Sequence, residues 1–307
     1  MIRADHVTKI FRSASSPEPH IALHDLSCTI PGGCIYGLVG SNGAGKSTFL
    51  RLLSGVYRPD GGTIEIDGLP VWENPVAKAQ IFYVPDDLYF LPQTTMQKMA
   101  NYYRALYDTF DTDRFRHLTE TFGLDPHAGI NTFSKGMRRQ AATILALSTM
   151  PDYLFFDETF DGLDPVMRRL VKQVIYADVL DRGTTTIITS HSLRELEDTC
   201  DQLALLHRGG IVLESDVQNL KTALFKVQIA FADAYDRTRF ESAGVSILSY
   251  TQMGSVATLI VRGDRTATED CLRRMNPLLL DILPLNLEEV FIYEMEALGY
   301  AFRDILA

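Results

Sequence analysis

Several features are scarce or missing in this sequence of 307 residues, and each excludes a class of protein. No run of about 18 apolar residues occurs, so no segment is expected to span a bilayer. Residues 1–6 form no apolar leader, which predicts a chain that is not secreted. The 4 cysteines are scattered without a CxxC pair, which is typical of reduced thiols. Together these absences predict a cytoplasmic protein.

Basic residues are also few relative to acidic ones. The chain has 29 Lys and Arg against 39 Asp and Glu, which gives a formal net charge of −10. Proteins that bind nucleic acid through its phosphates usually present a basic surface. The charge therefore argues against nucleic acid as the main partner, although it leaves room for a local basic pocket.

What the sequence does contain is a glycine-rich loop at residues 40–48, between an apolar run and a helical pattern. This context and spacing are typical of a phosphate-binding loop. Glycines let backbone N–H groups close around a phosphate, and the helix that starts near Ser47 directs its positive dipole end at the same anion. Lys46 would reach the β- and γ-phosphates, and the Ser47 hydroxyl would hold Mg²⁺. The predicted nucleotide contacts are Gly40, Ser41, Asn42, Gly43, Ala44, Gly45, Lys46, Ser47 and Thr48.

Two carboxylates end an apolar strand that is predicted at residues 153–156. We expect Asp157 to hold Mg²⁺ beside the loop, and Glu158 to orient and deprotonate an attacking water. A later strand ends at His191, from where the imidazole can reach a γ-phosphate. An acidic turn and a structural histidine are the alternatives, and the phosphate-binding loop upstream favours the catalytic interpretation.

A second helix with free N–H groups is predicted to begin near Ser134. Its first turn, capped by the serine side chain, forms a second anion site. In a single chain this second site would have no explanation. If two copies face each other head to tail, each Ser134 can close on the nucleotide of the other copy.

Taken in order, these pieces resemble the nucleotide-binding subunit of an ATP-binding cassette transporter, over about residues 1–220. Residues 40–48 are similar to the Walker A motif of that family, and residues 154–158 to its Walker B motif with the catalytic glutamate. Residues 133–137 resemble the signature motif, residues 162–164 the loop that contacts the second subunit, and His191 the switch histidine. The resemblance implies that Phe11 stacks on adenine, and that Ser134, Lys135, Gly136 and Asp164 lie at the nucleotide.

The predicted fold class is α/β, with a P-loop NTPase core, an antiparallel β subdomain and an inserted helical subdomain at about residues 95–150. Residues 1–220 are predicted to form this cassette domain. The order of patterns in residues 221–307 is βαββαβα, which is typical of a small ferredoxin-like α+β module. We therefore expect a separate C-terminal accessory domain there.

Two positions depart from the pattern of the family. Lys135 stands where the signature usually has glycine, and it is expected either to face the γ-phosphate of the partner or to be solvated. Asp86 stands where the family has a glutamine that touches Mg²⁺ and senses the membrane partner. Asp86 is therefore a candidate Mg²⁺ ligand that is one carbon shorter, and it either binds the ion more tightly or lies too far away.

The resemblance implies an ATPase subunit on the cytoplasmic face of the cell membrane, with ATP and Mg²⁺ as cofactors. Two such subunits, identical or paralogous, would drive export through separate integral membrane permease subunits. Tyr89, Phe90 and Leu91 either receive a short helix of that permease or pack inward. The alternative is a soluble cassette ATPase acting on a ribosome or on DNA. Such proteins usually carry two cassettes or a long coiled-coil insertion, and neither is visible here.

Overall fold

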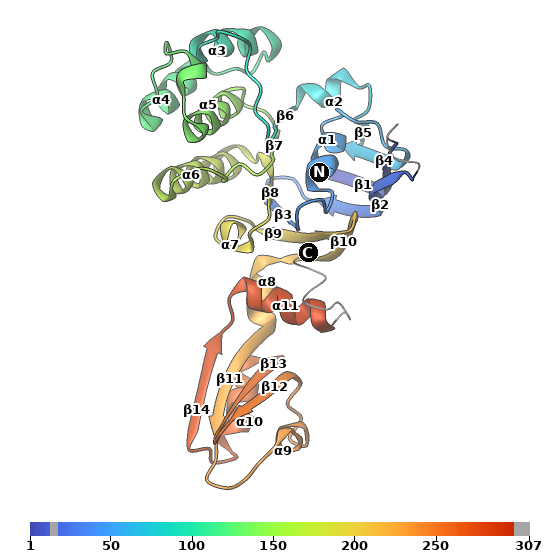
Figure 1. Ribbon diagram of the computed structural model, residues 1–307, viewed down its shortest axis with the longest axis vertical. Coiled ribbons are helices and arrows are strands. Elements are labelled where there is room, and N and C mark those ends of the chain that lie inside the picture. The colour runs from blue at the N-terminus through green and yellow to red at the C-terminus, as the bar shows by residue number, and fades with distance from the viewer. Residues whose placement is uncertain (13–17, 298–307) are drawn as a thin grey trace. The chain divides into compact units, whose positions relative to one another are not determined.

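The computed structural model describes residues 1–12 and 18–297, and the chain divides into two compact units, Met1–Glu214 and Ser215–Ala307. The first unit is a mixed α/β structure, and the second has its own antiparallel sheet (Figure 1). This arrangement confirms the predicted α/β fold class. Within the described residues, no helix is long and apolar enough to cross a membrane.

A six-stranded sheet forms the centre of the first unit, in the order β10-β9-β3-β8-β7-β6. Strands β3, β7 and β8 pair in parallel and are buried along their whole length, as expected for a sheet with helices on both faces. The carboxyl ends of parallel strands lie at one edge, which is where such sheets bind ligands. The bounds are β3 (Ile35–Val39), β6 (Ile81–Val84), β7 (Tyr153–Phe156), β8 (Thr185–Ser190), β9 (Gln202–His207) and β10 (Gly210–Asp216).

A second, antiparallel sheet lies on one side of this core, in the order β2-β1-β4-β5. Its apolar residues share one cluster with α1 and with strand β3, so the two sheets and this helix form a common core. The bounds are β1 (Ile2–Phe11), β2 (His20–Ile30), β4 (Gly61–Ile66), β5 (Leu69–Pro70), α1 (Lys46–Leu53) and α2 (Pro75–Ala79).

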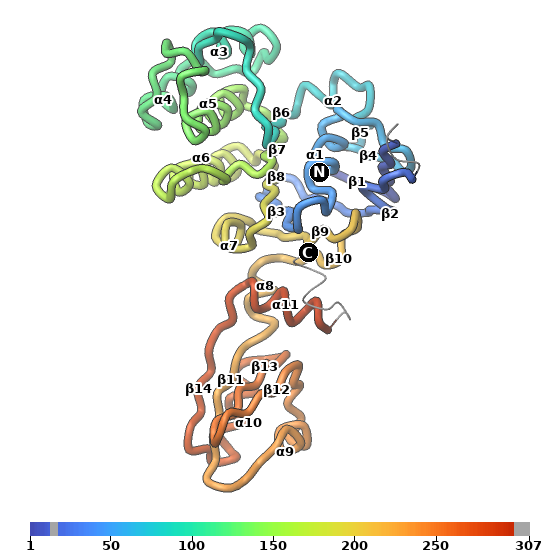
Figure 2. The backbone as a smooth tube through the Cα atoms, in the orientation of Figure 1, coloured from blue at the N-terminus to red at the C-terminus, as the bar shows by residue number. Residues whose placement is uncertain are grey.

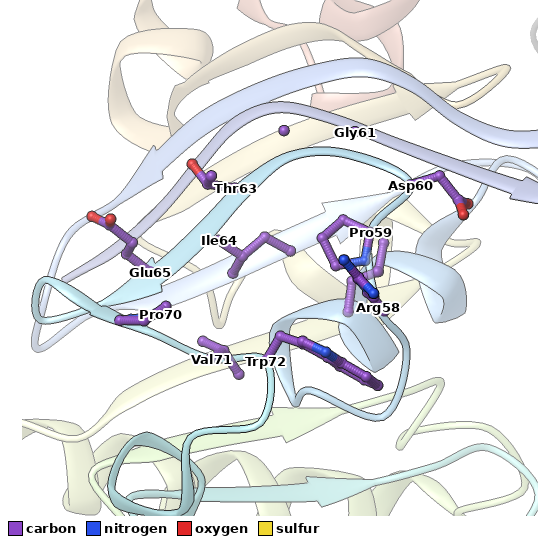
Figure 3. Close-up of a pocket in the computed structure, with 12 residues that line it drawn as sticks. Arg58, Pro59, Asp60, Gly61, Thr63, Ile64, Glu65, Pro70, Val71 and Trp72 are labelled. Carbon is purple, nitrogen blue, oxygen red and sulfur yellow. The ribbon is translucent and has the colours of Figure 1, made fainter.

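The antiparallel sheet also carries a pocket of about 310 Å³. Figure 3 shows Arg58, Pro59 and Trp72 at one end of it and Glu65 with Pro70 at the other. None of its lining residues belongs to the motifs at residues 40–48, 133–137 or 154–158. The pocket therefore contains none of the residues of these three motifs.

The regular elements between β6 and β7 are all helices, joined by loops, and Figure 2 shows this segment leaving the central sheet and returning to it. Each of its α-helices begins at a side-chain cap: Thr95, Asp111 and Ser134 accept hydrogen bonds from the first-turn N–H groups. The bounds are α3 (Met96–Leu106), α4 (Thr112–Phe122), the 3₁₀ helix η1 (Ile130–Thr132) and α5 (Lys135–Ser148). Later in the chain, α6 (Pro165–Arg182) follows β7 and α7 (Leu193–Leu196) follows β8.

The second unit is a four-stranded antiparallel sheet in the order β12-β13-β11-β14. One face of it packs on two helices, where Phe225, Phe240, Leu259 and Leu272 form a separate apolar core. The bounds are α8 (Val217–Ala223), β11 (Leu224–Ala230), α9 (Arg237–Glu241), β12 (Ile247–Met253), β13 (Val256–Arg262), α10 (Arg265–Arg273), β14 (Leu279–Pro284) and α11 (Leu287–Ala297). After α8 the element order is βαββαβα, and the unit starts slightly before residue 221.

Candidate functional site

The glycine-rich loop connects β3 to α1, and its glycines are required by close contacts. A Cβ atom on Gly40 would lie 2.4 Å from the carbonyl oxygen of Leu206. Gly45 has a φ of +110°, and a Cβ there would lie 2.7 Å from the carbonyl oxygen of Ala22. Because both contacts are with backbone atoms, they cannot be relieved by a side-chain rotation. The loop is thus held against β2 and β9 in a shape that larger residues would not permit.

Gly45→Ala should therefore destabilise the protein much more than Gly43→Ala. Gly43 also has a positive φ of +81°, but a Cβ atom added to it would have no other atom within 4 Å. We expect the free energy of unfolding to fall by about 1 kcal/mol in Gly43→Ala, from backbone strain alone. In Gly45→Ala it should fall by about 3 kcal/mol or more. Urea unfolding of both variants measures the difference. Equal losses would contradict the close contact at Gly45.

Lys46 is the first residue of α1, and its side chain is buried beneath the loop. Its Nζ atom donates hydrogen bonds to the carbonyl oxygens of Gly40 at 2.7 Å and Ser41 at 3.2 Å. The same atom forms an ion pair with Oε1 of Glu158 at 3.2 Å. A buried lysine needs such partners, because burial disfavours its charge. The structure therefore brings the loop lysine and the second carboxylate of β7 together.

Asp157 is fully buried at the end of β7 and accepts three hydroxyl hydrogen bonds. Its Oδ1 atom accepts from Ser47 at 3.0 Å and from Thr189 at 2.8 Å, and its Oδ2 atom accepts from Tyr83 at 3.1 Å. Burial, and then the Asp157 charge, raise the pKa of Tyr83, so its hydroxyl stays a neutral donor. Tyr83 and Thr189 were missed by the sequence reasoning; both carry a hydroxyl group on a buried strand that ends at this edge.

Ser47 and Asp157 fit a magnesium ion that keeps most of its ligands from water and phosphate. Their oxygens are the ligand type that Mg²⁺ prefers, and Mg²⁺ is usually bound by one or two protein side chains together with phosphate oxygens. Among the described residues, no group of three or more His, Cys, Asp and Glu could hold a metal by itself. Ser47 and Asp157 would therefore hold the ion as a site with few protein ligands.

Glu158 follows in an unusual backbone conformation, with a φ of +48°. Its N–H group donates to Oγ1 of Thr189 at 3.0 Å, which fixes this turn to β8. Its carboxylate lies between two partners, since Oε1 pairs with Lys46 and Oε2 lies 3.0 Å from Nδ1 of His191. Three predicted residues from three separate segments thus form one row of Lys46, Glu158 and His191.

The signature residues form a second cluster, built from the start of α5 and the turn at residues 161–164. The Ser134 hydroxyl accepts from the N–H of Met137 at 3.2 Å and caps α5. Lys135 pairs with Oδ2 of Asp161 at 2.7 Å, and a Cβ on Gly136 would lie 3.0 Å from the carbonyl oxygen of Gly162. The ion pair with Lys135 lowers the pKa of Asp161. Asp164 caps α6 by accepting from the N–H groups of Val166 and Met167. These contacts join the signature to the 161–164 turn and not to residues 40–48.

Two predicted residues lie in other surroundings. The Asp86 carboxylate accepts from Nη2 of Arg139 at 2.8 Å, and its described contacts do not include Ser47 or Asp157. The Phe11 ring, at the end of β1, packs edge-on against Tyr57 with 5.5 Å between the centroids. Arg139 is a residue that the sequence reasoning missed, because nothing in its local pattern distinguishes it from a surface arginine.

Comparisons with known proteins show what the sequence and the fold of this chain are similar to. A family model described as "ABC transporter" matches residues 23–161. The ABC transporter ATP-binding protein YtrB of Bacillus subtilis (strain 168) is 32% identical over 88% of this chain and 91% of its own length. The daunorubicin/doxorubicin resistance ATP-binding protein DrrA of Streptomyces peucetius is 32% identical over 72% of this chain and 69% of its own. A solved dimeric, post-hydrolysis state of the ATP-binding cassette MJ0796, bound to ADP and Pi, is similar in fold, with a TM-score of 0.65 at 19% identity over 71% of this chain and 99% of that one.

Proposed function

Because this chain belongs to the ABC transporter family of ATP-binding proteins, we propose that it hydrolyses Mg·ATP between two facing subunits and so drives export through a separate permease. Membership of the family makes the chain an ATP-binding subunit and an ATPase. The nucleotide contacts, the ion, the second subunit and the direction of transport are the parts proposed here.

The convergence of Lys46, Asp157 and Glu158 at one sheet edge is the observation that carries the proposal. Lys46 would exchange the carbonyl oxygens of Gly40 and Ser41 for phosphate oxygens, together with the backbone N–H groups of the loop. Ser47 and Asp157 would hold Mg²⁺, which neutralises charge on the phosphates when bound. The remaining contacts proposed in the loop are Asn42, Gly43, Ala44, Gly45 and Thr48.

Glu158 is proposed as the group that orients and deprotonates the attacking water. In the structure its carboxylate is occupied by Lys46 and His191. Release of Lys46 to the phosphates would free one carboxylate oxygen for the water, while the other stays on the imidazole. His191 is more than half exposed, so it can turn toward a γ-phosphate without leaving a packed core.

The second half of the site is proposed to come from another subunit. Lys135 and Gly136 contact the 161–164 turn of their own chain, and neither contact involves the loop at residues 40–48. Asp164 belongs to the same turn. A helix start with free N–H groups suits an anion, and in a head-to-tail pair that anion is the γ-phosphate of the facing subunit. Lys135 would add a positive charge there.

The permease is proposed to dock on the loop that follows β6. Tyr89 is 74% exposed and Leu91 43%, and together with Phe90 they border a pocket of about 250 Å³. The apolar side chains of this pocket would suit the apolar face of a short helix. Such docking would place the chain on the cytoplasmic face of the membrane. Export is proposed because residues 284–291 resemble the ending of exporter subunits, and because DrrA is named for drug resistance.

A mixing experiment tests the two-subunit site. Lys46→Ala should remove the loop half of the site, and Ser134→Arg should block the facing half. Each variant alone should be inactive, whereas an equal mixture should recover about a quarter of wild-type ATPase activity, because half of the dimers are mixed and each mixed dimer has one intact site. Phosphate release measures the recovery. A mixture that stays inactive at every ratio, with both chains folded, would contradict the proposal.

A further inference from the structure

A buried guanidinium links the segment after β6 to the beginning of α5. Arg139 is 1% exposed, and its Nη2 atom donates to Oδ1 of Asp86 at 2.8 Å. Its Nη1 atom donates to the carbonyl oxygens of Asp86 at 3.1 Å and Pro85 at 3.4 Å. One arginine therefore binds both the side chain and the backbone of the segment.

This pair is hard to break, because Arg139 has few other partners. Its Nε atom is buried and has no hydrogen-bond acceptor. If Asp86 were removed, the guanidinium would keep two carbonyl oxygens as described acceptors and would lose the carboxylate that forms its described ion pair. An ion pair that has lost one partner leaves an uncompensated buried charge, which is strongly unfavourable. We therefore expect the segment and the helix to move together.

The two elements that the pair joins have different roles in the proposed cycle. Asp86 begins the loop at residues 86–94, which carries the exposed Tyr89 and Leu91. Arg139 lies on α5, little more than one turn after its cap at Ser134. The charge on Arg139 also contributes, after Lys135, to the lowered pKa of Asp161 in the turn beside the signature. The guanidinium thus contacts the segment at residues 85–86 and acts electrostatically on Asp161 in the turn beside the signature.

We propose that Asp86 and Arg139 are a positioning pair that fixes the loop at residues 86–94 to the phosphate-facing end of α5. On this proposal Asp86 is not a magnesium ligand; its carboxylate acts through Arg139. A permease that displaces the loop would displace the Ser134 tip with it, and so change how well the tip closes on the facing nucleotide. The functional consequence rests on the proposed two-subunit site, whereas the mechanical link does not.

The test compares Asp86→Ala, Arg139→Met and the double variant. Methionine fills the volume of the arginine without leaving a buried charge. Asp86→Asn keeps an oxygen acceptor for Nη2 of Arg139, so its effect on the loop and the helix should be smaller than that of Asp86→Ala. Asp87→Ala is the matched control, since Asp87 is exposed in the same loop and makes none of these contacts.

The first measurement is hydrogen exchange of the protein without nucleotide. We expect Asp86→Ala and Arg139→Met to speed exchange about fivefold or more in residues 86–94 and in the first turn of α5, with the second unit unchanged. Exchange in the double variant should be no faster than in the faster of the two single variants, because the two side chains act as a unit. Exchange that rises equally throughout the chain, or effects that add, would overturn the pairing.

The second measurement places the same variants in a Glu158→Gln background. Dimer formation with ATP should weaken about tenfold for both single variants, while ATP affinity at low protein concentration and the Mg²⁺ concentration for half-saturation stay within twofold of the parent. A raised Mg²⁺ requirement with unchanged dimer formation would make Asp86 a metal ligand and overturn the proposal. If the Glu158→Gln parent itself forms no dimer, the two-subunit site has failed, and the exchange experiment still decides whether the pair couples loop and helix.

Discussion

Replacing Lys46 by alanine is expected to lower the affinity for ATP at least about a hundredfold, or ~2.7 kcal/mol. Lys46 is buried at the start of α1, where its ammonium group is surrounded by carbonyl oxygens and by Glu158. This is the cation that a triphosphate would meet inside the loop. Its loss removes charge-assisted hydrogen bonds, which are stronger than neutral ones, from a site largely shielded from water.

Fluorescence titration with a labelled ATP analogue measures this loss. Lys98→Ala is the matched control, because Lys98 is an exposed lysine on α3 and should leave the affinity unchanged. Circular dichroism and urea unfolding must show that the Lys46 variant is folded, since its removal also takes the ion-pair partner from Glu158. Unchanged ATP affinity in a folded Lys46→Ala protein would refute the assignment of residues 40–48.

Replacing Glu158 by glutamine is expected to slow ATP hydrolysis about 10²–10⁴-fold while ATP still binds. Glutamine has the same shape but cannot accept a proton from water at neutral pH. It can still occupy the place between Lys46 and His191, so the loop should keep its geometry. With hydrolysis stalled and closure intact, the variant should accumulate as an ATP-bound dimer.

Phosphate release and light scattering after size-exclusion chromatography measure these two effects. Glu120→Gln provides the control, since Glu120 is exposed on α4 and its removal changes the charge equally. Turnover near the wild-type rate would remove Glu158 from its catalytic role. Slow turnover without a dimer would support the catalytic role of Glu158 but would argue against the two-subunit site.

The glycine-rich loop was predictable because its residues are contiguous. Strand, turn and helix follow one another in the sequence, and the spacing of Gly40, Gly45 and Lys46 fixes their relation in space. Asp157 and Glu158 were predictable for a related reason, since parallel strands deliver the residues that follow them to one edge of the sheet. These parts of the site depend on local sequence and on one general rule of sheet topology.

The contacts that the sequence did not predict join segments far apart in the chain. Tyr83 and Thr189 reach Asp157 from β6 and β8, and their hydroxyl groups give no signal in a propensity pattern. The same holds for Arg139, whose partner Asp86 lies in another element. Asp86 was considered as a magnesium ligand because its position in the sequence matched that of a glutamine. Only the packing of α5 shows that the buried guanidinium of Arg139 binds the Asp86 carboxylate, which a magnesium ion would otherwise need.

The backbone at Glu158 has a consequence for anyone who wishes to make this protein more heat-resistant. A left-handed conformation costs a residue with a side chain roughly 1–3 kcal/mol, and here the hydrogen bond to Thr189 holds it in place. Glycine or asparagine at this position would relax the turn, so a search guided by thermal tolerance alone would select the substitutions that remove the carboxylate. On the proposed function, this costly backbone conformation holds the proposed general base in place at the end of β7.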